Sequence, residues 1–124
     1  MPQDNVVVRE CPTAELDVAD LTELRNLMSA AWPGGGFSDD DYAHGMGGRH
    51  WIAQVDGRIV SHASVVERPI EVEGRRLRTG YLEAVATLPD FENRGIGSLV
   101  VGGATEYVRV VFDFGALSTG RQTF

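Results

Sequence analysis

The chain has 124 residues, 43% of them hydrophobic, which is enough for a single domain with its own core. Its formal charge of −7 argues against nucleic acid as a general partner and would attract a small polycationic molecule. No apolar run approaches the length of a membrane span, and the N-terminus lacks the pattern of a signal peptide. A single cysteine, Cys11, excludes an internal disulfide. These features predict one cytoplasmic domain, residues 1–124, that does not associate with membranes.

The first part of the chain predicts a strand followed by two helices. Asn5–Glu10 is expected to be the strand, and apolar residues recur at helical spacing over Leu21–Ala31. Asp20 and Glu23 occupy the N-cap and N3 positions of a capping-box-like start for that helix. Ser38 is the expected N-cap of a short second helix, which ends before a run of glycines.

Beyond residue 49 the apolar pattern changes to a period of two, which is typical of strands. Asp56-Gly57 and Glu73-Gly74 are turn signals between successive strands. The elements expected here are strands at His50–Val55, Arg58–Val66, Ile70–Val72 and Arg76–Thr87, a helix at Gly95–Phe112 and a last strand at Phe114–Ser118. This order favours an α+β fold. It would be a mostly antiparallel mixed sheet flanked by helices, with one parallel, right-handed β–α–β crossover near its end.

The segment Arg94-Gly95-Ile96-Gly97 joins a predicted strand to a predicted helix. A helix N-terminus presents unpaired amide N–H groups, and glycine lets a phosphate approach the backbone closely. An ordinary tight turn into a helix has the same pattern, and two glycines alone do not separate these interpretations.

Three histidines, at positions 44, 50 and 62, show no metal-ligand spacing on one helical face. We therefore interpret them as structural or exposed side chains and predict no metal. Trp32 and Trp51 are interpreted as core or pocket wall.

The stretch EAVATLPDFENRGIGSLVV, residues 83–101, resembles motif A of the GCN5-related N-acetyltransferase (GNAT) superfamily. In that family, a strand is followed by Gln/Arg-x-x-Gly-x-Gly/Ala at the head of a helix, whose amides hold the pyrophosphate of acetyl-CoA. The six positions here are Glu92, Asn93, Arg94, Gly95, Ile96 and Gly97, and Glu92 departs from the family's Gln or Arg. The more specific stretches FSDDDYAHGMGGRH and GYLEAVA resemble aminoglycoside 2'-N-acetyltransferases.

The resemblance implies the GNAT fold and transfer of an acetyl group from acetyl-CoA to an amine of a small cationic molecule such as an aminoglycoside. It implies that the backbone N–H of Val85 stabilises the oxyanion and that Glu83 accepts a proton from the amine. Further implied cofactor contacts are Val85, Ala86, Thr87 and the six motif positions, and implied substrate contacts are Asp41, Glu83, Ala84 and Ser118. From the residues alone, an exposed strand carboxylate is the favoured interpretation of Glu83, while Asp41 can equally be a helix N-terminal charge and Ser118 a cap.

Members of that family continue after the last strand with a helix, whose tyrosine protonates the coenzyme A thiolate, and with further strands. The resemblance therefore implies that this chain is truncated and lacks the C-terminal strands of the fold. The strand Phe114–Ser118 would then expose an edge through which a homodimer can form. Three functions stay open: an aminoglycoside 2'-N-acetyltransferase, a related enzyme with another amine acceptor, and a non-catalytic acyl-CoA-binding module.

Overall fold

A computed structural model of the chain describes residues 5–36 and 38–117. In these ranges the main sheet has the strand order β1 (Val6–Pro12), β2 (Arg49–Val55), β3 (Arg58–Glu67), β6 (Thr79–Thr87) and β7 (Phe114–Leu117). Neighbouring strands are antiparallel except β6 and β7, which run parallel and are joined through α3 (Ile96–Val111). The predicted α+β class and the parallel crossover at the end of the sheet are confirmed.

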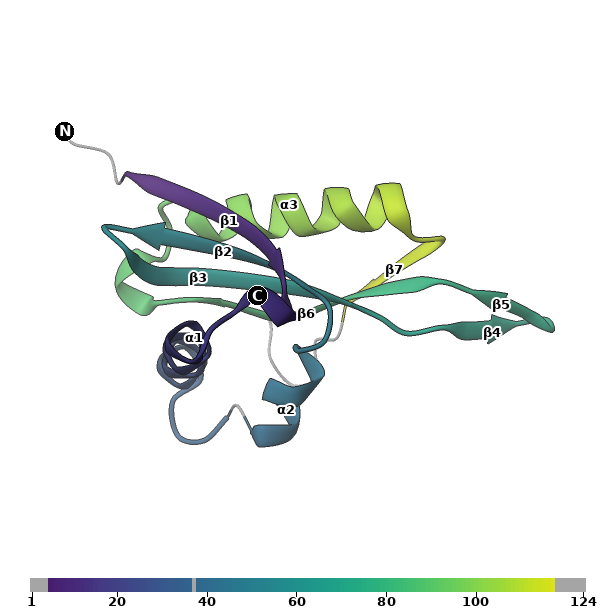
Figure 1. The fold of residues 1–124 in the computed structure, drawn as a ribbon, viewed down its shortest axis with the longest axis horizontal. Helices are drawn as coiled ribbons and strands as arrows, with labels where there is room; N and C mark the ends of the chain where they lie inside the picture. The colour runs from purple at the N-terminus through teal and green to yellow at the C-terminus, as the bar shows by residue number, and fades with distance from the viewer. Residues whose placement is uncertain (1–4, 37, 118–124) are drawn as a thin grey trace.

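Helices cover both faces of the sheet (Figure 1). α3 lies on one face, and α1 (Val18–Ala31) and α2 (Asp39–His44) lie on the other. β4 (Ile70–Val72) and β5 (Arg75–Leu77) form a separate hairpin that projects from the end of the sheet. Two 3₁₀ turns, Thr13–Glu15 and Pro89–Phe91, follow β1 and β6.

The core has two layers because the central strand β3 is covered on both sides. Its residues are buried without alternation from position 59 to position 65. α1 contributes Leu24, Leu27 and Met28 to the core, and α3 contributes Ile96, Val100 and Ala104. The polar side chains of Ser61, His62 and Ser64 are also fully buried in β3. Such groups need hydrogen-bond partners inside the protein.

α1 starts one turn earlier than the sequence pattern predicts. The Asp17 carboxylate accepts from the backbone N–H of Asp20 at 2.8 Å, and the Asp20 carboxylate accepts from the N–H of Asp17 at 3.2 Å. Asp17 is therefore the N-cap and Asp20 is N3, so the prediction of Asp20 and Glu23 in these positions was wrong. The carboxylate of Glu23 instead accepts from the backbone N–H of Ile59 at 2.7 Å, which ties α1 to the sheet.

The long strand predicted over Arg76–Thr87 is divided at Arg78 into β5 and β6. The backbone N–H of Arg78 donates to the Asp113 carboxylate at 2.9 Å, and its carbonyl accepts from the Asp113 N–H at 2.9 Å. These bonds fasten the junction to the corner between α3 and β7, so the backbone leaves the hairpin ladder at this point.

Glycine patterns in the sequence have clear structural reasons. Asp56 and Gly57, like Glu73 and Gly74, have left-handed backbones with φ between 50° and 80°, which confirms both predicted turns. Gly103 lies in the middle of α3, where a Cβ would meet Trp51 Cδ1 at 2.6 Å. A larger residue there would hold the helix off the sheet, so the glycine is a packing requirement.

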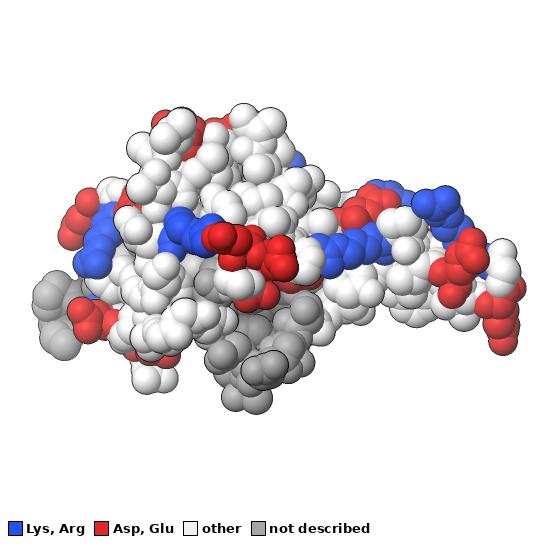
Figure 2. Space-filling view, turned by 90° about the horizontal axis from the view of Figure 1, so that it is seen from below, with Lys and Arg blue, Asp and Glu red and all other residues white. Residues whose placement is uncertain are grey.

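Figure 2 shows one face of the molecule, on which basic and acidic side chains lie next to one another. The projecting hairpin carries both signs. Glu71 pairs with Arg76 across its two strands, and Glu73 and Arg75 lie at its turn. This face therefore lacks the single-sign basic patch that nucleic-acid binding uses. Among the described residues, the helices are too short or too polar for a membrane crossing.

Candidate functional site

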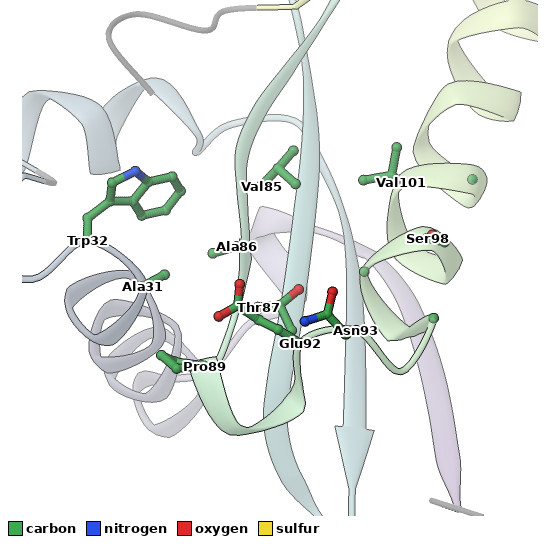
Figure 3. Close-up of a pocket in the computed structure, with 13 residues that line it drawn as sticks. Ala31, Trp32, Val85, Ala86, Thr87, Pro89, Glu92, Asn93, Ser98 and Val101 are labelled. Atoms are coloured by element: carbon green, nitrogen blue, oxygen red, sulfur yellow. The ribbon is translucent and has the colours of Figure 1, made fainter. Parts of the chain in front are cut away.

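A pocket of about 720 Å³ lies between β6, the start of α3 and the end of α1. This volume is in the range of cavities that hold small molecules and cofactors. Its walls are formed by Ala31, Trp32, Val85, Ala86, Thr87, Pro89, Glu92, Asn93, Gly95, Gly97, Ser98, Val101 and Gly102. Figure 3 shows the β6 residues on one side, Ser98 and Val101 of α3 opposite them, and Trp32 beyond β6. All the predicted cofactor contacts except Arg94 and Ile96 therefore lie in the walls of one pocket.

Within the described residues, β7 pairs with only the first half of β6. Their parallel register joins Thr79–Leu82 to Phe114–Leu117, and the second half of β6 continues beyond it. At that half, the N-terminal turns of α3 lie beside the strand in place of β7. Backbone groups on this edge of β6 are therefore presented to the pocket.

The register of β6 against β3 is interrupted where the strand enters the pocket. His62 pairs with Ala86 and Ser64 pairs with Glu83, so Ala84 and Val85 together oppose a single residue of β3. Ala84 has a φ of 50°, which is uncommon for a residue with a Cβ. This is a β-bulge, and bulges redirect local backbone and side chains, often next to active sites.

The turn from β6 into α3 forms a backbone cradle at the end of the pocket. Gly95 is the N-cap of α3 with a φ of 79°, a conformation that favours glycine. Gly97 packs so closely on β6 that a Cβ would lie 3.1 Å from Thr87 Oγ1. Among the described residues, no side chain caps this helix, and no acidic residue stands in its first turn. Its first N–H groups and the positive end of the helix dipole thus suit an anion.

The other three motif positions differ in their environment. Glu92 lines the pocket and is exposed, so its negative charge stands in water near the cradle. The Arg94 guanidinium lies over the Phe91 ring, 4.9 Å from its centroid, and Arg94 does not line the pocket. The Ile96 side chain is 2% exposed and packs in the core, so it anchors the first turn of α3 to the core.

Glu83 lies on β6 just before the bulge, with a side chain that is only 9% exposed. Arg68 donates to the Glu83 carboxylate at 3.2 Å and to the carbonyl of His44 at 3.1 Å. Burial raises the pKa of the Glu83 carboxyl, the nearby Arg68 guanidinium and the His44 side chain lower it in part, and Asp41 adds to the rise. A buried carboxyl with a raised pKa in this position is suited to general acid–base chemistry.

α2 brings a second acid close to this point. The Asp41 carboxylate accepts from the N–H of Ser38 at 2.9 Å, which confirms the predicted helix start at Ser38. At the other end of α2, Gly45 packs against the bulge, where a Cβ would lie 2.9 Å from the Cβ of Ala84. Asp41, Glu83 and Ala84 are therefore grouped on one side of β6. Ser118 lies outside the described residues.

Several features of the site were not found from the sequence. Arg68 and the α3 residues Ser98 and Val101 depend on how distant segments meet. Trp32 lines the pocket, which is one of its two predicted roles. His50 and His62 are both fully buried, which excludes the exposed alternative for these two, and His44 is exposed. Within residues 5–36 and 38–117, no group of three or more His, Cys, Asp or Glu has the arrangement of a metal site.

Comparison with known proteins places these features in a family. The chain matches the sequence model of the Acetyltransferase (GNAT) family over residues 18–117. It is 34% identical, over 106 residues, to an aminoglycoside 2'-N-acetyltransferase from Mycolicibacterium fortuitum. That match covers 86% of this chain and 54% of the relative, so the chain spans about half of the relative's length.

Solved structures share the fold at low sequence identity. The aminoglycoside N-acetyltransferase AAC(6')-Iy, solved with CoA, has a TM-score of 0.66 and 21% identity, covering 97% of this chain and 80% of that one. An aminoglycoside acetyltransferase from an uncultured soil metagenomic sample, solved with sisomicin, has a TM-score of 0.66 and 15% identity, covering 94% and 78%. A transcriptional regulator from Bacillus halodurans C-125 has a TM-score of 0.69 and 18% identity, covering 94% and 83%. The family match and the shared fold agree with the motif A resemblance: the chain belongs to the acetyltransferase (GNAT) family.

Proposed function

We propose that this chain binds acetyl-CoA in the pocket between β6 and α3 and takes part in N-acetylation of a small cationic amine. The proposal rests on the observation that one pocket contains two features of backbone conformation that suit acetyl-CoA. The bulge at Ala84 and Val85 lies on one wall, and the glycine cradle at Gly95 and Gly97 lies at its end. The same fold is found in AAC(6')-Iy, which was solved with CoA.

The cradle holds the pyrophosphate. The first N–H groups of α3, from Ile96 to Ser98, are free of side-chain caps and donate to the phosphate oxygens. Gly97 keeps the space beside Thr87 that a Cβ would fill, so the backbone can approach an anion closely. The exposed Glu92 carboxylate opposes binding by about 1 kcal/mol at a separation of about 4 Å in water.

Acetyl transfer forms an N–C bond between the amine and the acetyl carbon and breaks the C–S bond of the thioester, so coenzyme A leaves as a thiolate that takes up a proton from water. The step needs an oxyanion donor and an acceptor for the proton of the amine. Bound in this pocket, acetyl-CoA supplies an activated thioester carbonyl. The N–H of Val85 donates to that carbonyl oxygen as its negative charge develops, which is the general device of acyl transfer. Glu83 accepts the proton that the amine loses, directly or through water, and its raised pKa brings it closer to this task.

We propose an aminoglycoside-like molecule as the acceptor. The support is the 34% identical relative, which is an aminoglycoside 2'-N-acetyltransferase, together with the net charge of −7 and the acidic pair Glu83 and Asp41. Arg68 already neutralises part of that acidic group, so a cationic amine must compete with its guanidinium. This contact favours a second candidate function, a module that binds acyl-CoA without turnover.

Two measurements on the purified chain test the cofactor site: calorimetric titration with acetyl-CoA, and thermal unfolding with and without acetyl-CoA. Acetyl-CoA at about a hundred times its Kd should raise the free energy of unfolding by about 2.7 kcal/mol. We expect Glu92→Gln to bind about fivefold more tightly, because removing about 1 kcal/mol of repulsion changes Kd by that factor. The absence of both binding heat and a thermal shift at millimolar acetyl-CoA would contradict the proposal.

Thiol release from acetyl-CoA then separates the two candidates. An acetyltransferase releases CoA only when an acceptor is added, and an aminoglycoside should support release better than a simple peptide amine. A chain that binds acetyl-CoA tightly but releases no thiol with any amine is the binding module.

A further inference from the structure

A line of hydrogen bonds runs from the bulge through two buried histidines, His62 and His50, to the loop that precedes β2. His62 Nδ1 lies 2.8 Å from the carbonyl oxygen of Ala84, and His62 Nε2 lies 2.8 Å from His50 Nδ1. His50 Nε2 lies 2.6 Å from Thr13 Oγ1, which accepts from the backbone N–H of Gly47 at 2.9 Å. The line joins the bulge on β6 to the loop between α2 and β2.

The direction of every bond in this line follows from its ends. A carbonyl oxygen only accepts, so His62 Nδ1 carries a hydrogen and donates to Ala84. A neutral imidazole has one N–H, so His62 Nε2 accepts from His50 Nδ1–H, and His50 Nε2 in turn accepts from the Thr13 hydroxyl. Burial lowers the pKa of His62 to about 3 and that of His50 to about 4, so both rings are neutral at physiological pH. Both histidines therefore hold the Nδ1–H tautomer.

The Ala84 carbonyl, at which the line begins, belongs to the same peptide unit as the proposed oxyanion donor, the N–H of Val85. The carbonyl of Ala84 and the N–H of Val85 are in one planar trans peptide, so they point in opposite directions. A ring that holds the carbonyl on one side thereby directs the N–H to the other side.

That other side is the pocket. His50 and Trp51 are consecutive on β2 and point to opposite faces of the sheet. Trp51 packs against Gly103 of α3, so His50, and with it His62, lies on the face opposite α3. The N–H of Val85 is thus directed away from β3 and towards the α3 side, where Val85 lines the pocket.

We infer that His62, supported by His50, is a positioning residue that fixes the Ala84–Val85 peptide with the Val85 N–H facing the acyl group. The inference rests on the proposed function of Val85. Left-handed Ala84 is disfavoured on its own, and the charge-neutral donor His62 Nδ1–H supplies a fixed partner for its carbonyl. Neither histidine lines the pocket, so both act through the backbone.

Asparagine and leucine at position 62 give a matched pair of variants. Both have the same shape and both lose the contact with His50, but the amide nitrogen of Asn occupies the place of His62 Nδ1 and keeps the donor. We expect the Val85 amide resonance of the ligand-free chain to stay near its wild-type position in His62→Asn and to move in His62→Leu. Equal Val85 resonances in the two variants would overturn the inference.

Ligand discrimination tests the consequence. S-ethyl-CoA has the size of acetyl-CoA but lacks the carbonyl, so the ratio of the two Kd values measures the bond to Val85. We expect wild type and His62→Asn to prefer acetyl-CoA roughly fivefold, the worth of one hydrogen bond, and His62→Leu to lose the preference with unchanged S-ethyl-CoA affinity. An undiminished preference in His62→Leu would overturn the inference.

Two results separate this inference from the proposed function. If the wild-type chain binds neither acetyl-CoA nor S-ethyl-CoA, the proposed cofactor site is wrong. The comparison of Val85 resonances in the two variants then tests the positioning role without any ligand. If His62→Leu does not fold, the imidazole nitrogen spectrum of the wild-type chain decides it. Nδ1–H tautomers on both rings agree with the inference, and an Nε2–H tautomer on His62 overturns it.

Discussion

Gly95 offers a direct test of the cradle, because alanine there disfavours the left-handed backbone conformation without adding a steric clash. Its φ is +79°, and an added Cβ meets no atom within 4 Å. A left-handed alanine costs about 1–2 kcal/mol, and the stiffer unfolded chain offsets about 0.4–1 kcal/mol of this. Gly102 in the same helix also has open space around an added Cβ and lacks a positive φ, so it is the matched control. Gly102→Ala should gain about 0.5–1 kcal/mol.

Urea unfolding measures this difference. The two alanine variants should lie on opposite sides of wild type and differ by about 1.5 kcal/mol, which separates their midpoints by roughly 0.5–1.5 M. Gly95→Asn should fall between wild type and Gly95→Ala, because asparagine tolerates the left-handed region better than alanine. If Gly95→Ala is as stable as Gly102→Ala, the turn at residue 95 is not left-handed and the cradle geometry is wrong.

Three further results are expected. Gly103→Ala should lower the free energy of unfolding by about 1–3 kcal/mol by forcing Trp51 aside, and equal urea midpoints for it and wild type would contradict that packing. Because the folded-state pKa of Glu83 is raised, stability should fall as pH rises from the unfolded to the folded pKa. Urea unfolding at a series of pH values measures this dependence. Glu83→Gln should abolish the fall. Arg68→Met should extend it to higher pH, because the guanidinium that lowers the pKa of Glu83 is removed. For His62 the sign is opposite: its pKa is lowered to about 3, so stability should be full above its unfolded pKa and fall as pH drops towards 3. His62→Asn should flatten that slope, and an unchanged slope would contradict a buried neutral ring.

Local features of the fold could be predicted because a few neighbouring residues determine them. Asp56-Gly57 needs two left-handed residues and has them, and Ser38 with Asp41 forms the capping box that starts α2. The start of α1 was misplaced by one turn because Asp17 and Asp20 are both able to cap a helix. The two are separated by the reciprocal bonds between Asp17 and Asp20 and by the ion pair of Asp20 with Arg9.

The arrangement around the bulge could not be predicted, because it depends on register between strands. Glu83 to Ala86 has the sequence of a regular strand, and no glycine marks the left-handed Ala84. A one-residue change of register exchanges the faces of a strand, so the partners of Glu83 and His62 are not visible without it. Arg68 is 15 residues from Glu83, and His50 is 12 residues from His62. The motif resemblance located the pocket residues but contained no information about these contacts.

The central claim is that acetyl-CoA binds across the bulge and the cradle. It is tested most directly by following the backbone amide resonances of the chain during titration with acetyl-CoA. We expect the largest shifts at Val85 and at the first N–H groups of α3, Gly97 and Ser98, with little change in the β4–β5 hairpin. Saturable shifts confined to another surface, or no shifts at millimolar acetyl-CoA, would contradict the claim.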